Sequence, residues 1–400
     1  MNLCPLCAAD KVTPFLDCRM QPVCNRFLTS PTEDEFKHPM IMGQCEACGL
    51  VQIINPVPAR ELLPQYDWIT YNEPEGHLDE LAEIVGNLPG LTRESAICGI
   101  SFKDDSTLRR LKQRGFERTW RIDPAADLGI RDRAAGVETI QDRLTFEAAD
   151  RIARKYGAPD VVIVRHILEH AHDPFGFMRV LGQLVNPEGY VVFEAPDCTL
   201  SLEKYDYTTL WEEHIVYFTP ETFRHCFGFG GFSLVRFECY PYPYENSLVG
   251  IVQPRKGIDP GRLSISVLEA EKSRALAFSQ GLTKQRAVLT SFFSEYRKSQ
   301  GNIAVFGAGH LACAFINLME LKDDIEFVVD DHPNKVGLFM PGSRMPILGS
   351  AALLDGKIKL CLLSLSPESE AKVIQKNQNF IQRGGTFASI FPASKYALQM

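Results

Sequence analysis

Apolar positions in the central part of the chain fall into short runs, and each run is followed by a stretch in which apolar residues recur every three to four positions. Short apolar runs are typical of buried strands, and the longer period is typical of helices that cover a sheet. The predicted strands are residues 95–100, 119–122, 161–164 and 190–194, and the predicted helices are residues 106–114, 146–156 and 175–185. Because strands that alternate with helices pair in parallel, the pattern predicts an open α/β sheet.

Two further segments are expected to complete this sheet. Residues 233–240 and 247–253 are apolar and rich in β-branched side chains, which predicts two closing strands that form an antiparallel edge. Residues 260–300 then mix apolar and charged positions at helical spacing. This spacing predicts one long helix or two shorter helices that act as a connector.

The last hundred residues repeat the alternation of strands and helices. Strands are predicted at residues 302–306, 325–329 and 360–364. The length of the chain, at roughly 150 residues per domain, is consistent with two to three domains. We expect four parts, which are residues 1–75, an α/β domain at 76–254, the helical connector at 255–300 and a second Rossmann-like domain at 301–400.

Six of the twelve cysteines lie in the first 48 residues, and four of these form two Cys-x-x-Cys pairs. Cys4 with Cys7, and Cys45 with Cys48, each place two thiols on a tight turn. Two such turns that face each other form the tetrahedral four-sulfur shell that Zn²⁺ favours. A redox pair is expected instead beside a helix start in a thioredoxin-like unit. We therefore predict that these four cysteines hold a structural zinc ion in the 1–75 module.

The charge and hydropathy of the chain exclude several classes of protein. Lys and Arg number 42 against 50 Asp and Glu, which gives a formal net charge of −8 and argues against binding to nucleic acid through its phosphates. The chain has no run of 18 apolar residues, and its first residues lack the basic and then apolar order of a signal peptide. We therefore expect a cytoplasmic protein with neither a nucleic-acid partner nor a membrane partner.

Polar residues follow two of the predicted strands at the edge where the carboxyl ends of parallel strands meet. Asp123 follows the second strand, which is the usual place of a carboxylate that binds a ribose. The third strand is followed by four polar residues, which are Arg165, His166, Glu169 and His170. Core packing explains polar residues poorly at such a place, so the sequence predicts a nucleotide-binding and reactive edge there.

The loop after the first strand contains fewer glycines than a nucleotide-binding loop usually has. Gly99 is its only glycine, and Ser101 takes the place of the usual first glycine. Asp104 or Asp105 is a candidate to receive an ammonium group or a ribose hydroxyl. The close backbone approach that glycines permit is therefore expected to be partly lost.

The chain resembles the sugar C-methyltransferases of deoxysugar and surface-glycan pathways over nearly its whole length. In the first 80 residues the resemblance rests on CPLC, NRFL, CEACGLVQI and YDWITYNEPEGH. In the central part it rests on HILEHAHDP, WEEHIVYFT and YENSLVGI. Near the end it rests on VFGAGHLACAF and on the long string VVDDHPNKVGLFMPGSRMPI.

This resemblance implies a Rossmann-like class I methyltransferase sheet, with a zinc-binding module before it and a Rossmann-like domain after it. It implies S-adenosylmethionine as methyl donor, and a nucleotide-diphosphate sugar, held with the help of the C-terminal domain, as the partner. We expect a monomer or a weak homo-oligomer. The residues expected at the donor are Gly99, Ser101, Asp104, Asp123, Arg165 and His166.

The resemblance also implies roles in catalysis. Methylation of a sugar carbon requires removal of a proton beside a ketone, and histidine suits the role of base because its unperturbed pKa lies near neutrality. His214 is the candidate base, and Glu213 is expected to orient it or to hold the sugar. His170, Tyr66 and Tyr71 are expected to donate hydrogen bonds to the enolate oxygen.

Two other functions are compatible with the same sequence. Gly307 in GAGHLA and Asp330 at the end of the next predicted strand satisfy the dinucleotide fingerprint, so an NAD-dependent oxidoreductase is one alternative. A non-catalytic relative that binds a nucleotide-sugar is the other, and the altered loop around Gly99 favours it.

Overall fold

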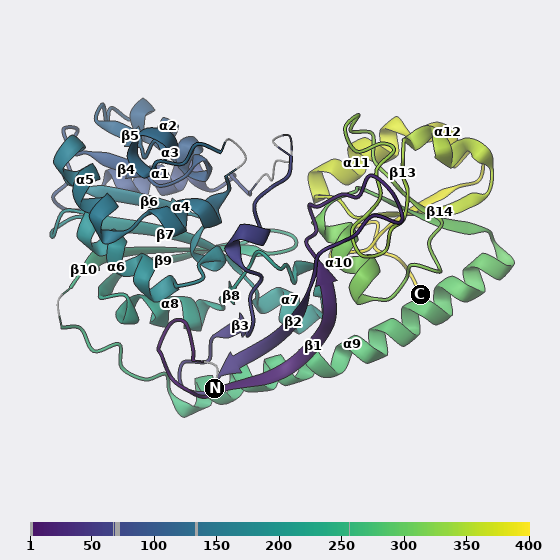
Figure 1. Cartoon of the computed structure of the whole chain (residues 1–400), viewed down its shortest axis with the longest axis horizontal. Coiled ribbons are helices and arrows are strands. Elements are labelled where there is room, and N and C mark those ends of the chain that lie inside the picture. Colours follow the sequence, from purple (N-terminus) through teal and green to yellow (C-terminus); the bar gives the residue numbers. More distant parts are fainter. Residues whose placement is uncertain (1–2, 67, 69–72, 133–134, 256) are drawn as a thin grey trace. The chain divides into compact units, whose positions relative to one another are not determined.

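The chain forms two compact units, each of which collects segments that are distant in the sequence. The structure is a computed structural model, and it describes all residues except 1–2, 67, 69–72, 133–134 and 256 (Figure 1). Unit 1 comprises Met1–Pro14, Met42–Thr199 and Glu213–Lys272, and unit 2 comprises Phe15–Ile41, Leu200–Glu212 and Ser273–Met400. The residues between the two cysteine pairs therefore belong largely to unit 2, which differs from the predicted single module at residues 1–75.

The core of unit 1 is a six-stranded sheet of order β5-β4-β6-β7-β10-β9 (Figure 1). Its strands are β4 (Ile97–Gly99), β5 (Thr119–Arg121), β6 (Val161–Arg165), β7 (Tyr190–Asp197), β9 (Phe232–Tyr240) and β10 (Asn246–Pro254). The first four strands pair in parallel, and β10 pairs antiparallel with both β7 and β9. The predicted open α/β sheet with an antiparallel edge is confirmed.

Helices cover both faces of this sheet because its central strands are buried throughout. All five residues of β6 are buried, so both of its faces require an apolar cover. One face packs against α1 and α2, through residues such as Leu81 and Leu111. The other face packs against α5, α6 and α8, through residues such as Ile152, Leu181 and Phe223. The zinc-module cysteines Cys4, Cys45 and Cys48 belong to the same apolar cluster as this second face.

Most helices of unit 1 begin at a residue that caps them. Asp173 accepts a hydrogen bond from the Gly176 N–H at 2.8 Å and starts α6, and Thr145 caps α5 in the same way. The helices are α1 (Leu78–Gly86), α2 (Asp105–Gln113), α3 (Pro124–Leu128), α4 (Val137–Arg143), α5 (Phe146–Tyr156), α6 (Pro174–Leu184) and α8 (Pro220–Phe229). Short 3₁₀ turns lie at η1 (Ala59–Glu61), η2 (Phe102–Asp104) and η3 (Leu168–His170).

A four-stranded sheet, which contains residues assigned to both units, joins the zinc module to the segment before α8. Its order is β1-β2-β3-β8, with β1 (Val12–Pro22), β2 (Lys37–Cys45), β3 (Val51–Ile53) and β8 (Val216–Tyr217). β3 pairs antiparallel with both β2 and β8. β3 begins shortly after Cys48 and β8 begins shortly after the candidate base His214, so hydrogen bonds between these strands connect the two regions.

Unit 2 contains a five-stranded parallel sheet of order β13-β12-β11-β14-β15. Its strands are β11 (Asn302–Phe306), β12 (Phe327–Val329), β13 (Ile347–Leu348), β14 (Ile358–Leu363) and β15 (Thr386–Ser389). Its helical segments include η4 (Tyr207–Thr209), α10 (His310–Leu318), η5 (Ser350–Asp355), α11 (Pro367–Lys376) and α12 (Gln378–Gln382). The three strands that the sequence predicts here are confirmed, and together with two short ones they form a Rossmann-like sheet.

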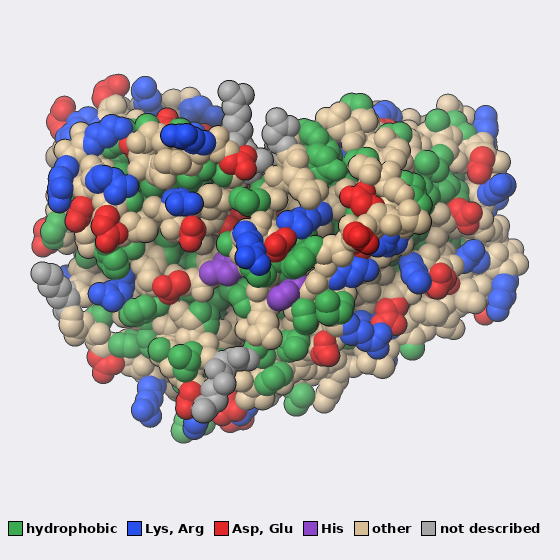
Figure 2. All heavy atoms as spheres, in the orientation of Figure 1, with side chains coloured by type: hydrophobic (Ala, Val, Ile, Leu, Met, Phe, Trp, Pro, Cys, Tyr) green, Lys and Arg blue, Asp and Glu red, His purple; other side chains and the backbone are tan. Residues whose placement is uncertain are grey.

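Two helices contain residues of both units. α7 (Thr199–Lys204) begins at the last residue of one unit-1 segment, and α9 (Ile265–Ser299) is a single helix of 35 residues. The sequence pattern left one long helix or two shorter ones open, and the structure shows one. Among the described residues, no helix combines the length and the apolar character needed to cross a bilayer. Figure 2 shows acidic and basic side chains interspersed over the visible face.

Candidate functional site

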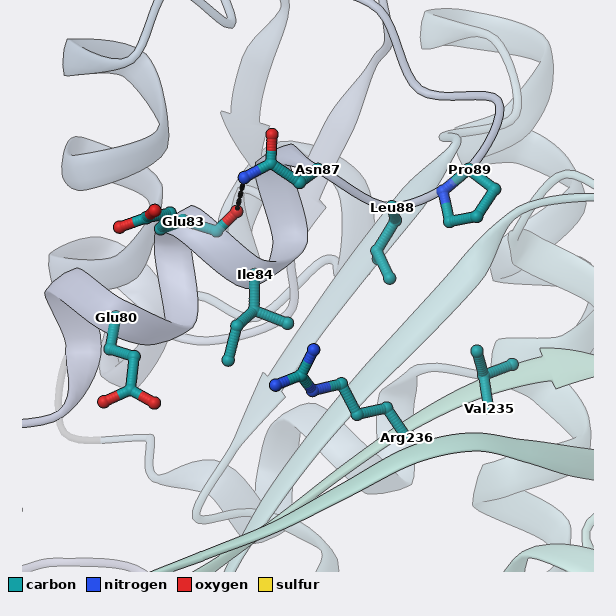
Figure 3. A pocket seen from close by; sticks show the side chains of 8 residues that line it. All are labelled: Glu80, Glu83, Ile84, Asn87, Leu88, Pro89, Val235 and Arg236. Carbon is teal, nitrogen blue, oxygen red and sulfur yellow. Dashed lines mark hydrogen bonds between the residues drawn. The ribbon is translucent and has the colours of Figure 1, made fainter.

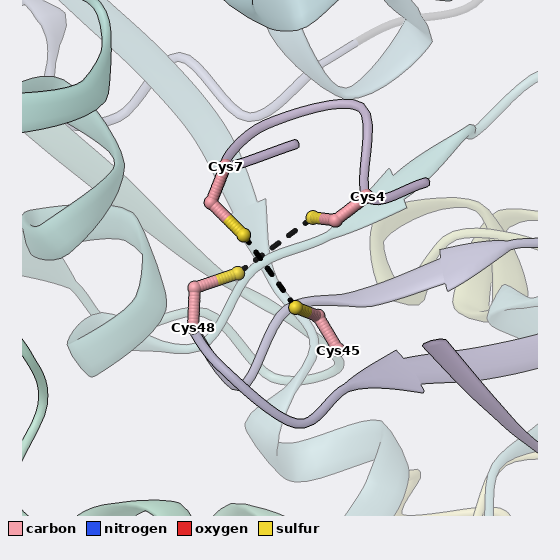
Figure 4. Close-up of side chains that lie close together, drawn as sticks. All are labelled: Cys4, Cys7, Cys45 and Cys48. Carbon is pink, nitrogen blue, oxygen red and sulfur yellow. Dashed lines mark hydrogen bonds between the residues drawn. The ribbon is translucent and has the colours of Figure 1, made fainter. Parts of the chain in front are cut away.

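The four predicted cysteines lie together, each with its sulfur directed at the others (Figure 4). The Sγ atoms of Cys4 and Cys48 are 3.7 Å apart, and those of Cys7 and Cys45 are 3.5 Å apart. A zinc ion bound at about 2.3 Å by four thiolates separates the sulfurs by about 3.8 Å in a tetrahedron. The sulfur cage therefore fits Zn²⁺ with little adjustment, and the sequence prediction of these ligands agrees with the geometry.

The backbone around the second cysteine pair explains why these residues form a tight turn. The Gly49 N–H donates to the Cys45 carbonyl at 2.9 Å, and Gly49 has a φ of +77°, in the left-handed region that glycine adopts without strain. Hydrogen bonds among the four thiols lower the pKa of Cys45 and raise the pKa of Cys4 and of Cys48. Zinc ligation requires the thiolate form, so binding of the ion releases the protons that the thiols still hold.

Backbone hydrogen bonds tie this zinc module to the candidate base. The Ile53 N–H donates to the Ile215 carbonyl at 2.9 Å, and the Ile215 N–H donates to the Glu169 carbonyl at 2.7 Å. His214 precedes Ile215, so its backbone lies between the zinc module and the turn that follows β6. The position of His214 consequently depends on both elements.

His170 and His214 form the centre of a compact group at the carboxyl end of β6. Their rings pack edge to face, with centroids 4.7 Å apart and an interplanar angle of 83°. Ligand atoms of Glu169, His170 and His214 lie within 4.8 Å of one another, and the same holds for Glu138, His170 and Glu213. The structure therefore brings together the predicted residues Glu213, His214 and His170, and adds Glu138.

Glu138 is a member of this group that sequence reasoning missed. It lies in the first turn of α4, and its Oε1 is 2.9 Å from His170 Nδ1. Burial raises the pKa of the Glu138 carboxyl, but the hydrogen bond and the charge of His170 outweigh it, so the pKa is lowered overall. No local motif marks Glu138, because its partner is 32 residues away in the sequence.

Of the two predicted tyrosines, Tyr66 lies in the described part of the chain. The Tyr66 ring is tilted against that of Trp68, with centroids 4.9 Å apart. Tyr71 lies outside the described residues. Their predicted role as hydrogen-bond donors to an enolate oxygen stays a prediction.

The loop after β4 is closed by its own carboxylate. Asp104 is fully buried, and its Oδ2 accepts hydrogen bonds from the N–H groups of Ile100 at 2.7 Å and Ser101 at 2.8 Å. Its Oδ1 accepts the N–H of Arg165 at 2.8 Å, which links the ends of β4 and β6. A Cβ on Gly99 would lie 2.9 Å from the Asp104 Cβ, so glycine is needed there for close packing. Asp104 therefore has a bracing role, which differs from the predicted contact with an ammonium group or a ribose.

Glu194 on β7 holds a buried ionic network at the same edge. Its carboxylate accepts from Arg165 Nε at 2.5 Å and from Ser247 Oγ at 2.8 Å, and it lies 3.0 Å from His166 Nε2. His77 Nε2 is 3.1 Å away. Arg165 faces Glu194 across neighbouring strands, and its guanidinium also donates to the Lys103 carbonyl. Arg165 and His166, which the sequence predicts at the methyl donor, therefore both bind Glu194, a residue that the sequence analysis did not identify.

The network shifts the pKa values of its members in consistent directions. Burial raises the pKa of Glu194, but the charges of Arg165 and His166 outweigh it and hold the pKa well below the usual range. Burial lowers the pKa of His166, and the charges of Glu73 and Glu194 reverse this and raise it to about 10. Burial raises the pKa of Asp104 to about 7. His166 also has a φ of +47°, so the chain turns sharply there at a strained position.

Asp123 lies where the sequence predicts it, directly after β5. It is exposed, and its Oδ1 accepts the N–H of Ala126 at 2.8 Å, which caps α3. A carboxylate that binds a ribose usually lies at this position, and the contact of Asp123 with the ribose of S-adenosylmethionine stays a prediction. The methionine end of the donor fits less well, because the N–H groups of Ile100 and Ser101 already bind Asp104. A donor carboxylate can use those two groups only if Asp104 moves.

Among the hollows lined by described residues of unit 1, two differ in their relation to the site. One, of about 360 Å³, borders the His170 group, and its lining includes Glu138, Gln141, Phe146 and Phe177. The other, of about 660 Å³, lies between the α1 region and the edge strand β9, and four apolar and four polar residues line it (Figure 3). This second hollow contains none of the predicted site residues.

The turn around Gly307 in unit 2, which has the dinucleotide fingerprint, is also held by contacts within the chain. Gly307 has a φ of +107°, and a Cβ there would lie 2.9 Å from the Ser364 carbonyl oxygen. Asp330 Oδ2 accepts the N–H of Ala308 at 3.0 Å and lies 3.1 Å from Lys335 Nζ. The carboxylate that the fingerprint assigns to a ribose therefore braces its own turn.

Family models match three successive parts of the chain. Residues 4–62 match a zinc binding domain, residues 103–236 match a methyltransferase domain, and residues 268–392 match a C-methyltransferase C-terminal domain. Among curated proteins, the C-methyltransferase NovU of Streptomyces niveus is 22% identical, over 97% of this chain and 95% of that protein.

Solved structures are similar to part of the chain. An O-methyltransferase family protein of Burkholderia thailandensis is 16% identical, with a TM-score of 0.30, and covers 44% of this chain and 56% of its own. CalO1, a methyltransferase in calicheamicin biosynthesis with bound S-adenosylhomocysteine, is 13% identical, with a TM-score of 0.29, and covers 44% of this chain and 53% of its own.

The order of the three matched domains agrees with the order that the sequence predicts. The cofactors of these domains are S-adenosylmethionine and zinc, as expected. Along one chain, the protein therefore matches a zinc binding domain, a methyltransferase domain and a C-methyltransferase C-terminal domain, and it is similar over almost its whole length to a C-methyltransferase.

Proposed function

We propose that the protein methylates a carbon beside the ketone of a nucleotide-diphosphate keto-deoxysugar. The single observation that carries this proposal is the group of buried His170 and Glu213 with half-buried His214 at the carboxyl end of β6, where substrates bind in open α/β sheets. The full-length likeness to a protein named C-methyltransferase supports it.

The chemistry divides between the donor and the side chains. S-adenosylmethionine supplies an activated methyl group when bound. His214 takes the proton from the carbon beside the ketone, and the resulting enolate carbon is the nucleophile. Glu213, adjacent in sequence, stays the candidate to orient His214 or to hold the sugar. The site positions the two carbons in line, which is the other large contribution to the rate.

The contact between Glu138 and His170 changes the role that we assign to His170. Its Nδ1 faces a carboxylate, so His170 supports the base instead of donating to the enolate oxygen. Tyr66 and Tyr71 remain the candidates for that donation, the contribution that is usually largest in such reactions.

The test separates proton removal from methyl transfer. In D₂O with S-adenosylhomocysteine in place of the donor, the wild type should exchange the proton beside the ketone of a nucleotide-diphosphate 4-keto-6-deoxyhexose. With S-adenosylmethionine it should form a carbon-bound methyl group, detected by NMR. His214→Gln should bind S-adenosylhomocysteine as the wild type does and lose both reactions. If His214→Gln still exchanges the proton beside the ketone, His214 is not the base.

Calorimetry distinguishes the other two functions. Binding of NAD without binding of S-adenosylhomocysteine would favour an oxidoreductase. Binding of a nucleotide-sugar alone would favour the non-catalytic relative.

A further inference from the structure

The pair formed by Glu138 and His170 has the geometry of a carboxylate that orients a histidine. Glu138 Oε1 lies 2.9 Å from His170 Nδ1, and both residues are buried, with 7% and 2% of their surface exposed. The glycine at position 136 leaves room for the carboxylate, because a Cβ on Gly136 would lie 2.7 Å from Glu138 Oε2. α4 therefore holds a carboxylate directed at one nitrogen of a histidine.

The ionisation of Glu138 decides which nitrogen of His170 carries the proton. An ionised carboxylate only accepts hydrogen bonds, so Nδ1 must be the donor in this contact. When His170 is neutral, its proton is therefore on Nδ1, and Nε2 is left as an acceptor. The carboxylate selects one of two tautomers that are otherwise close in energy.

The candidate base lies against the same ring. His214 packs edge to face with His170, and a ring nitrogen of His214 is within 4.8 Å of one of His170. Glu138, His170 and His214 thus form a row that begins at a buried carboxylate and ends at a half-buried histidine.

We propose that Glu138 is a positioning residue, which fixes the proton of His170 on Nδ1 so that Nε2 accepts a hydrogen bond from His214. His214 then presents its other nitrogen, with a lone pair, to the substrate. The proton leaves the carbon and joins that nitrogen, and the electron pair of the C–H bond becomes the enolate. The positive charge on His214 is stabilised by the acceptor Nε2, which Glu138 polarises from the far side. This inference rests on the proposed function.

Glu138→Gln tests it with almost no change of shape. The amide can donate to Nδ1 through its nitrogen, which favours the opposite tautomer and removes the acceptor from His214. We expect kcat for proton exchange and for methyl transfer to fall about 10²-fold or more, since general base catalysis contributes about 10²–10⁴-fold. KM and the affinity for S-adenosylhomocysteine should stay within about threefold, because Glu138 is not proposed to touch either ligand. Glu138→Asp keeps the acceptor and should recover part of kcat.

A spectroscopic readout tests the tautomer without any substrate. In protein with ¹⁵N-labelled histidine, His170 of the wild type should show a protonated Nδ1 and an unprotonated Nε2, and Glu138→Gln should reverse the two. The matched control is Glu188→Gln, which removes an exposed carboxylate from the turn before β7 and should change neither the spectrum nor kcat.

Three outcomes would overturn the proposal. They are a kcat of Glu138→Gln within threefold of wild type, an equal loss of kcat in Glu138→Asp, or a His170 proton that stays on Nδ1 in Glu138→Gln. If the wild type itself neither exchanges nor methylates the keto-sugar, the proposed function fails, and the NMR experiment still decides whether Glu138 sets the tautomer.

Discussion

Replacement of Glu194 by Gln should be among the most destabilising single changes at the carboxyl edge of the sheet. Glu194 is fully buried and compensates two buried cations, Arg165 and a His166 whose pKa is raised to about 10. The amide keeps the size of the side chain but removes the charge. Because the cations then lack their principal partner, the expected loss is about 3–5 kcal/mol, the usual result of breaking a buried ion pair from one side.

The loss should be visible in both thermal and chemical unfolding. Unit 1 contains about 230 residues. In a domain of 150–250 residues, each kcal/mol of lost stability lowers the midpoint of thermal unfolding by about 2–4 °C, so the midpoint should fall by about 6–20 °C. Urea unfolding of zinc-loaded protein, followed by circular dichroism, gives the free energy directly. Glu188→Gln removes an exposed carboxylate and should shift the free energy by no more than about 0.5 kcal/mol.

A double variant distinguishes the energetic effect of the ion pair from the effect of lost packing. Arg165→Met with Glu194→Met removes both charges, so it should cost less than Glu194→Gln alone. A loss below about 1 kcal/mol for Glu194→Gln, or additive effects of the two Met changes, would refute the view that Glu194 is the centre of the network.

Two further predictions concern zinc and pH. Cys48→Ser should lower the zinc content, measured by metal analysis, below one ion per chain. Because β3 pairs with the strand after His214, it should also reduce methyl transfer by about 10²-fold, which is the effect of misplacing a base by about 1 Å. Full activity of zinc-free protein in the transfer assay would contradict this coupling. Protonated His166 contributes stability that is fully present below its ordinary pKa of 6.5 and is lost as the pH rises toward the folded pKa of about 10. The free energy of unfolding should therefore fall over this pH window in the wild type and fall less in Glu194→Gln. An equal pH dependence of the two proteins would argue against the pairing of His166 with Glu194.

The parts of the fold that local patterns determine were predictable from the sequence. The helix Phe146–Tyr156 begins and ends where the periodicity predicts, because Thr145 caps it and Gly157 follows it. The cysteine pairs predicted the zinc shell, since the ligands of each pair are close in sequence. The position of Asp123 after a short strand was predictable for the same reason, whereas its contact with a ribose stays a prediction.

Long-range partners were not predictable. Glu194 and Glu138 lie in segments that show no motif, and their importance arises only when folding brings them to Arg165 and His170. The segment between the cysteine pairs reads as an insertion in the zinc module, yet its middle part packs in unit 2, and no local signal distinguishes these outcomes. Asp104 reads as a candidate ligand residue, and only the structure shows that the loop itself uses both of its oxygens.

The most direct test of the central claim is transfer of a deuterated methyl group from S-adenosylmethionine to a nucleotide-diphosphate 4-keto-6-deoxyhexose, followed by mass spectrometry and NMR of the product. We expect a methyl group bound to the carbon beside the ketone with the wild type, and unmodified sugar with His214→Gln. A label on oxygen, or equal product with both proteins, would contradict base-assisted methylation at the His170 and His214 group.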